Sequence, residues 1–570
     1  MPKKSFPKAG LLACIVMMAG TATAVAQVAP DAGSLQRQLR NGIPDIRPQP
    51  SPTAPAVTPE PRDDGPRLRV KGFVIEGASL IPEAELKAMI ADQTDRDLSL
   101  GDLQKLTARI SDAYRQRGYF ARSYLPAQEP RDGIIRITVI EGHFGKIIQA
   151  QPPRRANAEF VTSVAGSRLQ PGAPYSADAL ERGLLLANDL PGVTVDGTLK
   201  AGNATGTSDL LLEITDDPLL SGYVSGDNSG TRATGHYRGT AGAYLNGLTG
   251  FGDQLSLLGL ASHGLTYGQV EWSVPLGHDG LRARAALTGL DYDLIGDFKD
   301  LDAEGTAVTQ QVEISYPLLR SDRHSLWARL NYEHGRYDDD TLGLALHRKR
   351  MDKGSIAVEG NRADAWAGGG TSYYGVALTI GSLDLSRLRA DAALDAATAR
   401  TDGTFTKLAI DLRRDQALGG AFFLRARLVG QWSGRNLDSS EQLALGGPVG
   451  IRAYPVNEGI GDSGAIANVE LHYPIRSGLA SGLDVFGFAD AGLTRRHADK
   501  WRGWNAGSND PNSYPLFGAG IGATYIRADG LGVTLVAAVP IGANQGAPSG
   551  LNQDGGKSDP RIWFSLSKKF

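Results

Sequence analysis

Residues 218–570 form a series of short segments in which apolar and polar residues alternate. A clear example is the segment Val270-Glu271-Trp272-Ser273-Val274. A period of two is typical of a strand that has one apolar face. Further segments of this kind lie near 253–262, 281–290, 310–319, 325–333, 371–380, 404–412, 422–431, 465–475, 516–526 and 531–541. The stretches between them are rich in Gly, Asp and Asn, and helix signals nearly vanish, so we predict β-structure for this whole region.

Such a series is typical of a transmembrane β-barrel, whose strands present one face to lipid and the other to a polar lumen. At about 9–11 residues per strand, plus turns and loops, the region predicts roughly sixteen antiparallel strands. The alternative is one or several soluble β-sandwiches, although a single sandwich of this size would be large. The C-terminus favours the barrel, because a strand that runs to the last residue can pair with the first strand. Its apolar face is formed by Ile562, Phe564, Leu566 and Phe570.

Two earlier regions, 67–142 and 143–217, share one order of predicted elements: strand, helix, helix, strand, strand. In the first region Ser99 and Asp102 give the capping signal of a helix. In the second region Ser176 is the expected cap of a helix that ends before Pro191-Gly192. We therefore predict two small α+β domains of one plan. Their open sheet edges could accept an extended peptide as an added strand, or neighbouring segments could cover them.

The N-terminal region divides into three parts. Residues 1–26 have a lysine-rich start, a short apolar core and the small residues Ala24-Val25-Ala26, as in a cleaved export signal. An anchor helix is the alternative, but the apolar core is short for one. Residues 27–43 predict a short helix with Leu35 and Leu39 on one face. Alone it is too short to be stable in water, so it must dock on another part of the protein or stay disordered. Residues 44–66 are Pro-rich and predict an extended spacer.

Composition narrows the classes of function. The formal net charge is −3, so the chain lacks the excess of basic residues that would indicate binding to nucleic acid. The only cysteine, Cys14, lies in the export signal, so thiol catalysis and cysteine metal sites are not expected in the mature chain. We find no catalytic set, no metal-ligand spacing and no cofactor motif; the glycines of 518–523 lie in a strand pattern with no helix after them. Asp338-Asp339-Asp340 is expected to be a solvated acidic loop rather than a cation site.

The segment 446–464, which reads GGPVGIRAYPVNEGIGDSG, is too long and irregular to be a strand. Its central cation is Arg452. On the strand near 483–492, Asp490 shares a face with Phe488, and this face should point to the lumen because a charge facing lipid is costly. A carboxylate there favours an arginine partner, whose fork can bind both oxygens. We predict that the two residues pin the loop inside the barrel; the alternative is that both are simply hydrated.

Several motifs together resemble the two-partner secretion transporters, the TpsB family of haemolysin or haemagglutinin activation and secretion type. These motifs are the loop around Arg452, the strand FADAG at 488–492, the tract DNSGTRATGHYRG at 227–239 and the aromatic C-terminus. The resemblance covers the mature chain. It implies a helix that plugs the pore at 27–43, a linker at 44–66, POTRA domains at 67–142 and 143–217, and an outer-membrane barrel at 218–570. It also matches Arg452 and Asp490 to the family's loop–barrel lock, with surroundings at Gly450, Tyr454, Phe488 and Gly492.

The family's function gives the expected activity. The resemblance implies export of a large β-helical partner, a TpsA-type exoprotein such as a haemolysin or filamentous adhesin, without ATP. The periplasmic POTRA domains would bind its N-terminal secretion domain, and Leu35 and Leu39 would belong to the plug helix. We expect a monomer in outer-membrane lipid, with no enzymatic activity, cofactor or metal. The alternatives are a barrel-assembly insertase, a passive channel and a barrel enzyme.

Overall fold

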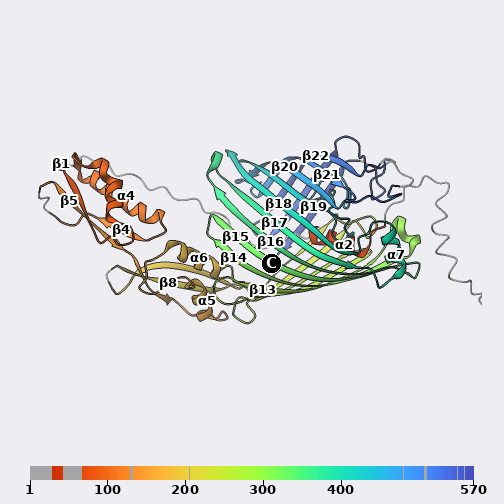
Figure 1. The fold of residues 1–570 in the computed structure, drawn as a ribbon, viewed down its shortest axis with the longest axis horizontal. Helices are drawn as coiled ribbons and strands as arrows, with labels where there is room; N and C mark the ends of the chain where they lie inside the picture. The colour runs from red at the N-terminus through yellow and green to blue at the C-terminus, as the bar shows by residue number, and fades with distance from the viewer. Residues whose placement is uncertain are drawn as a thin grey trace, which may run out of the picture.

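The computed structural model describes residues 29–42, 67–128, 132–204, 206–478, 480–505, 510–547, 550–557 and 559–570. The expected export signal and Pro-rich spacer lie outside these residues. Two small α+β domains lie at one end of an elongated molecule, and a large barrel forms the other end (Figure 1). Among the described helices none has the length and apolar character needed to cross a membrane.

The first α+β domain combines a three-stranded sheet in the order β2-β5-β4 with two helices. Ser99 starts the longer helix as predicted, because its hydroxyl accepts a hydrogen bond from the amide of Asp102 and the Asp102 carboxylate accepts one from Ser99. The predicted first strand is split at Lys71 into two strands, and the first of these pairs with a strand that the sequence analysis did not predict, β3. The elements are β1 (Arg67–Val70), β2 (Gly72–Glu76), α3 (Glu83–Ile90), η1 (Ala91–Gln93), β3 (Arg96–Ser99), α4 (Leu100–Gln116), β4 (Ala121–Tyr124) and β5 (Ile134–Glu141).

The second α+β domain repeats this topology. Its sheet has the order β6-β8-β7, with β6 parallel and β7 antiparallel to β8, just as β2 is parallel and β4 antiparallel to β5. Ser176 caps its second helix as predicted, accepting a hydrogen bond from the amide of Ala179 at 3.2 Å. The predicted repeat is therefore present in the fold. The elements are β6 (His143–Gln149), α5 (Ala158–Ala165), α6 (Ala177–Asn188), β7 (Val193–Ala201) and β8 (Thr207–Asp216).

Sixteen antiparallel strands, β9 to β24, form a closed barrel, which confirms the expected fold and strand number. Consecutive strands are neighbours throughout, and β24 pairs with β9 to close the ring, with Ser565 opposite Asp227 and Lys569 opposite Tyr223. The strands are β9 (Leu220–Asp227), β10 (Arg238–Asn246), β11 (Gln254–Ser262), β12 (Leu265–Pro275), β13 (Arg282–Asp293), β14 (Ala303–Arg320), β15 (His324–Thr341), β16 (Leu344–Asp364), β17 (Gly370–Asp384), β18 (Gly403–Gly419), β19 (Phe422–Ser433), β20 (Ser463–Ile475), β21 (Leu483–Arg495), β22 (Ser513–Ile526), β23 (Leu531–Pro540) and β24 (Arg561–Lys569).

The two faces of the strands differ as the alternation predicts. Val270 and Trp272 on β12 are exposed on the outer face, whereas Tyr267 on the other face of the same strand is buried in the interior. On the last strand, Ile562 and Leu566 also point outward. Apolar side chains on the outside and buried polar groups inside are the arrangement that a lipid-embedded barrel requires.

The structure corrects two expectations about the region 218–570. Strands β9, β10 and β16 were not among the predicted alternating segments. In the middle of β16 both faces carry charges, with Lys349 and Lys353 buried inside and Arg350 exposed outside, so the apolar alternation is interrupted there. The region also contains a helix, α7 (Arg389–Ala397), in the connection between β17 and β18, where helix signals were said to vanish. Two short 3-10 helices are η2 (Gly296–Leu301) and η3 (Trp366–Gly368).

Candidate functional site in the barrel lumen

The connection between β19 and β20, residues 434–462, folds into the lumen and is called the luminal loop below. Its tip residues Ile451, Ala453 and Tyr454 are completely buried. They form a hydrophobic cluster with side chains of the barrel wall, which include Phe488, Leu516, Val536, Ala538 and Trp563. The loop therefore packs on one side of the barrel interior.

Short-range hydrogen bonds give the luminal loop its shape. The amide of Ile451 donates to the carbonyl of Leu445 at 2.8 Å, and the amide of Gly446 donates to the carbonyl of Glu458 at 2.9 Å. Gly450 lies so close to this turn that a Cβ atom would be 2.1 Å from the Leu445 carbonyl oxygen. Only glycine fits such a close approach of two backbone segments.

The structure brings Arg452 and Asp490 into direct contact. The Arg452 Nε donates to one carboxylate oxygen at 3.0 Å and its Nη2 donates to the other at 2.6 Å. The backbone amide of Arg452 adds a third hydrogen bond at 3.0 Å. The side chains are 7% and 0% exposed, so the pair is buried and bidentate. One carboxylate on β21 thus holds both the side chain and the backbone of the loop tip.

Four further groups surround this pair. The guanidinium of Arg452 lies over the ring of Phe488, 3.5 Å from its centroid, and its Nη1 donates to Glu470. The indole Nε1 of Trp563, on the last strand, donates to the Arg452 carbonyl at 2.7 Å. Asn468 donates to the carbonyl of Gly450 at 2.9 Å and to the Asp490 carboxylate at 2.8 Å. Strands β20, β21 and β24 therefore bond the side chain of Arg452 and the backbone carbonyls of Gly450 and Arg452.

The other residues proposed from sequence also lie here. Tyr454 is buried in the hydrophobic cluster beneath the tip. A Cβ atom at Gly492 would lie 2.5 Å from the Cδ1 of Ile451, so the barrel wall needs a residue without a side chain where the loop packs on it. Sequence analysis missed Asn468, Glu470 and Trp563. A signal for the first two was present, since Asn468, Glu470 and His472 occupy alternate positions of one strand, which places three polar side chains on its inner face.

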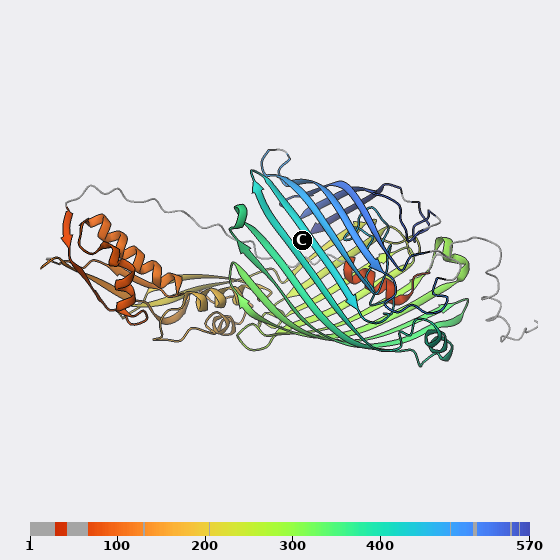
Figure 2. The ribbon, with the colours of Figure 1, turned by 45° about the horizontal axis from the view of Figure 1, so that its top comes forward.

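Helix α2 (Ala32–Gly42) lies inside the barrel, as both ribbon views show in red (Figure 2). Leu35 and Leu39 are each 1% exposed and belong to a hydrophobic cluster with side chains of the barrel wall. The predicted apolar face of the helix therefore packs on the interior of the barrel rather than on the α+β domains. An isolated helix of this length would be marginal in water, so these contacts supply the docking that it needs.

Buried charges hold the N-terminal end of α2. Asp31 accepts hydrogen bonds from Lys349 at 2.6 Å and from Ser439 at 2.6 Å. The amide of Ala32 donates to Asp339 at 2.8 Å. Asp339 is 1% exposed and lies in β15, so the expectation of a solvated acidic loop at Asp338–Asp340 is wrong. Its carboxylate instead meets the positive end of a helix, a favourable position for an anion.

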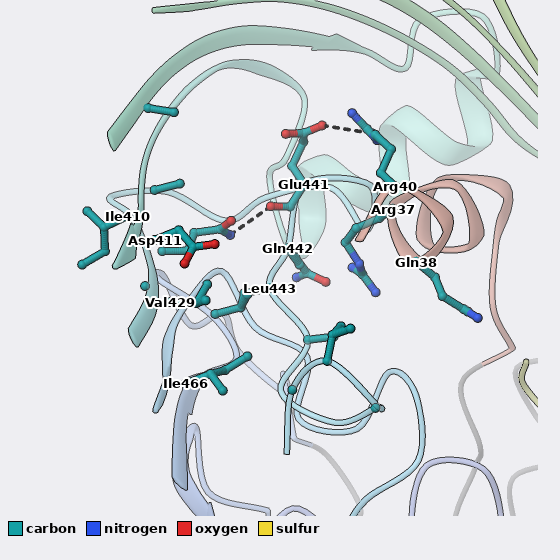
Figure 3. Close-up of a pocket in the computed structure, with 18 of the residues that line it drawn as sticks. Arg37, Gln38, Arg40, Ile410, Asp411, Val429, Glu441, Gln442, Leu443 and Ile466 are labelled. Atoms are coloured by element: carbon teal, nitrogen blue, oxygen red, sulfur yellow. Dashed lines mark hydrogen bonds and ion pairs between the residues drawn. The ribbon is translucent and has the colours of Figure 1, made fainter. Parts of the chain in front are cut away.

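The C-terminal end of α2 meets a second buried network. Arg40 lies 3.1 Å from Glu333 and 3.9 Å from Glu441. In Figure 3, a dashed line joins Arg40 to Glu441, which extends from the luminal loop. Glu441 also contacts Lys353 and Lys407, each at 2.6 Å. The helix thus completes an ion network that spans β15, β16, β18 and the loop.

The helix and the luminal loop also touch each other. Asn457 accepts a hydrogen bond from Arg37 at 3.1 Å and donates one to Gln38 at 3.3 Å. Asn457 has a φ of 67°, a left-handed conformation that asparagine tolerates better than most residues. Beside them the lumen keeps a cavity of about 770 Å³, lined by Arg37, Gln38 and Arg40 on the helix and by Gln442 and Leu443 on the loop (Figure 3).

Charged contacts connect the second α+β domain to the barrel. Asp189, next to α6, accepts two hydrogen bonds of 2.8 Å from Arg320 at the end of β14. Asp279, in the turn between β12 and β13, accepts from Arg168 and Arg182 of the domain. Burial raises the pKa of Asp279, but the hydrogen bonds from Arg168, Tyr316 and Arg182 outweigh it and lower the pKa to about 2.

Comparisons with known proteins agree with this architecture. The family model described as "Haemolysin secretion/activation protein ShlB/FhaC/HecB" matches residues 206–525, and a model of the "POTRA domain, ShlB-type" matches residues 68–142. Over 307 residues the chain is 30% identical to the heme/hemopexin transporter protein HuxB of Haemophilus influenzae (strain 86-028NP), covering 52% of this chain and 53% of HuxB. Over 293 residues it is 27% identical to the outer membrane transporter CdiB of Escherichia coli, covering 50% and 47%. The chain thus spans about half the length of the curated relatives it matches.

Two solved structures share the fold. CdiB from Escherichia coli superposes with a TM-score of 0.70 at 19% identity and covers 96% of this chain and 100% of CdiB. BamA from Haemophilus ducreyi lacking POTRA domains 1–3 gives a TM-score of 0.52 at 15% identity, covering 88% and 100%. The likeness to BamA is therefore the weaker of the two.

Proposed function

Because this chain belongs to the haemolysin secretion/activation protein family (ShlB/FhaC/HecB), we propose that it exports a large secreted partner protein through the lumen of its barrel. The partner is a TpsA-type exoprotein that enters from the side of the two POTRA-type domains and leaves at the opposite end. The protein is a monomer in the outer membrane with both domains in the periplasm, after removal of an export signal at 1–26. Its activity is transport, without catalysis, a cofactor or a metal.

The observation that carries the proposal is helix α2 in the lumen. A helix held by charges and two leucines, rather than by covalent continuity with the wall, is an element that can leave without disturbing the strands. We assign α2, within the segment 27–43, the role of a plug. Its departure would open the part of the lumen that it fills, and an unfolded chain fits such a space better than a folded one.

The luminal loop is the second functional element. Arg452 and Asp490 hold its tip against β21, and Asn457 connects the loop to the plug. We infer that this pair is a lock that keeps the loop in the position needed for export. Gly450, Tyr454, Phe488 and Gly492 support the lock by close packing beside it.

Capture of the partner is assigned to the edges of the two domain sheets. In the first domain β2 and β4 are edge strands, and in the second β6 and β7 are edge strands. An extended peptide can add to such an edge through main-chain hydrogen bonds with little sequence requirement. This mode fits a partner that arrives unfolded. The domains at 67–142 and 143–217, joined through the spacer 44–66 to the plug, would then deliver the chain to the barrel entrance.

Co-expression with a candidate exoprotein tests the proposal. We expect the partner in the medium when the full chain is present and in the periplasm when Arg452→Ala replaces it, with equal barrel insertion. Arg427→Ala is the matched control, because Arg427 is also a luminal arginine paired with a carboxylate, at 2.7 Å from Asp411, but lies outside the lock. Loss of other outer-membrane barrels on depletion of this protein, with normal export of the partner, would instead support an insertase.

A further inference from the structure

One side of the lumen carries an apolar surface that lies under the plug. It is formed by Leu260, Tyr267, Leu290, Tyr337, Leu383 and Phe405, which come from strands β11 to β13, β15, β17 and β18. All six side chains are buried with Leu35 and Leu39 in one cluster. We call these six residues the luminal apolar patch. A polar lumen that conducts only water and ions has no need of such a surface.

The charges around the plug keep partners when α2 leaves. Lys349 loses Asp31 but retains Asp438 at 2.8 Å. Lys353 retains Glu441 at 2.6 Å, together with Glu333 at 3.1 Å. The ionic part of the site is therefore self-sufficient within the barrel. The helix also packs on the apolar patch, in a cluster that includes Leu437 of the luminal loop, and exposure of this patch to water is unfavourable in proportion to the area exposed.

The spacing of the two leucines indicates what else could cover the patch. Leu35 and Leu39 are four residues apart in a helix, which places them about 6 Å apart along its axis. Alternate residues of an extended chain point to the same side and are spaced by about 6.5 Å. An extended segment with an apolar residue at every second position can therefore present two side chains at nearly the positions that α2 uses.

We propose that the luminal apolar patch is a transit contact for the exported chain and binds extended segments whose alternate residues are apolar. Helix α2 occupies the same surface at rest and is replaced by such a segment during export. The inference rests on the proposed function. Any chain that folds after export must carry apolar residues for its core, and a surface that shields them in passage needs only weak binding, because a chain held tightly would not move on.

Single-channel conductance tests this contact without the natural partner. The full chain lacking only residues 29–42 is placed in a planar bilayer, and a peptide with leucine at every second position, serine between and lysine at both ends is added. We expect blocks whose duration falls about tenfold when Leu290→Asn and Leu383→Asn are introduced together. An isomer of the peptide with its leucines adjacent should block only briefly.

Controls separate binding from misfolding. Thr379→Asn places an amide on the inner face of β17, the strand that carries Leu383, and should leave the blocks unchanged. The milder Leu290→Ala should shorten the blocks by a smaller factor while keeping the open conductance. Equal block durations in the patch variants and in the Thr379 control, or equal blocks by the two peptides, would overturn the inference. Export of the partner by the same deletion variant is measured separately, so failure of the proposed function is distinguishable.

Discussion

Replacing Arg452 with alanine should make the luminal loop open more often without unfolding the barrel. The substitution removes two side-chain hydrogen bonds to Asp490, the contact with the Phe488 ring and the ion pair with Glu470. It leaves the buried Asp490 carboxylate without its cation. Removing one partner of a buried pair typically costs about 3–5 kcal/mol. Asp490 keeps the amide of Asn468 and the backbone amide of residue 452, so we expect the lower end, about 3 kcal/mol.

Hydrogen exchange of the loop amides is the direct assay. The amides of Ile451 and Gly446 are hydrogen-bonded within the loop, and their exchange reports its opening. A loss of about 3 kcal/mol increases the open population by about a hundredfold. Exchange in β21 and β22 should stay unchanged, because their ladder hydrogen bonds are independent of the loop.

Three further variants test whether the Arg452–Asp490 pair holds the luminal loop. Arg452→Lys keeps the charge but loses the bidentate contact with Asp490. The exchange rate of its loop amides should therefore lie between those of the unchanged protein and of Arg452→Ala. Arg427→Ala should leave loop exchange unchanged, because its pair with Asp411 is partly exposed and its guanidinium bonds this barrel-wall carboxylate rather than the loop. In a double-mutant cycle with Asp490→Ala, a coupling energy near zero would refute the lock.

Three further changes give distinct outcomes. Replacing Leu35 and Leu39 together with aspartate should expel the plug, because carboxylates cannot be buried in its apolar cluster; planar-bilayer conductance should rise well above that of the unchanged chain, and unchanged conductance would contradict the plug assignment. The junction at Asp279, whose pKa is lowered to about 2, should be fully stable above the unfolded pKa of 3.8 and weaken as the pH falls from there toward 2; energy transfer between dyes on the domain and the barrel should report this, and Asp279→Asn should abolish the pH dependence. Glu141→Gln should destabilise the first domain by about 1–3 kcal/mol, because Glu141 accepts hydrogen bonds from the Leu80 amide and the Tyr114 hydroxyl; thermal unfolding of the chain measures it, and an unchanged transition would argue against the role of this carboxylate.

The parts of the fold that sequence could predict are those with local periodicity. Alternation identified most of the barrel, and the parity of Phe488 and Asp490 placed both on the inner face before any contact was known. Arg452 could be proposed as their partner because a single cation stood in a glycine-rich loop. These inferences need only the side-chain period of a strand and the cost of a charge in lipid.

The parts of the fold that could not be predicted depend on contacts between residues that are distant in the chain. The partner of the Ala32 amide is Asp339, 307 residues away, so nothing near the acidic run at 338–340 indicated burial. Strand β16 was missed because Arg350 on its outer face is charged, as are Lys349 and Lys353 on its inner face, which pair with Asp438 and Glu441 of the luminal loop. Where both faces of a strand carry charges, the polar–apolar pattern no longer indicates the strand.

The indole of Trp563 has a consequence for biogenesis. It lies on β24, the strand that closes the barrel by pairing with β9, and it donates to the carbonyl of Arg452, more than a hundred residues earlier. The same strand therefore both closes the barrel and supplies the hydrogen bond that supports the loop tip. A chain that ends before β24 lacks both contributions. Neither closure of the barrel nor this support of the loop tip can therefore form until β24 has been synthesised.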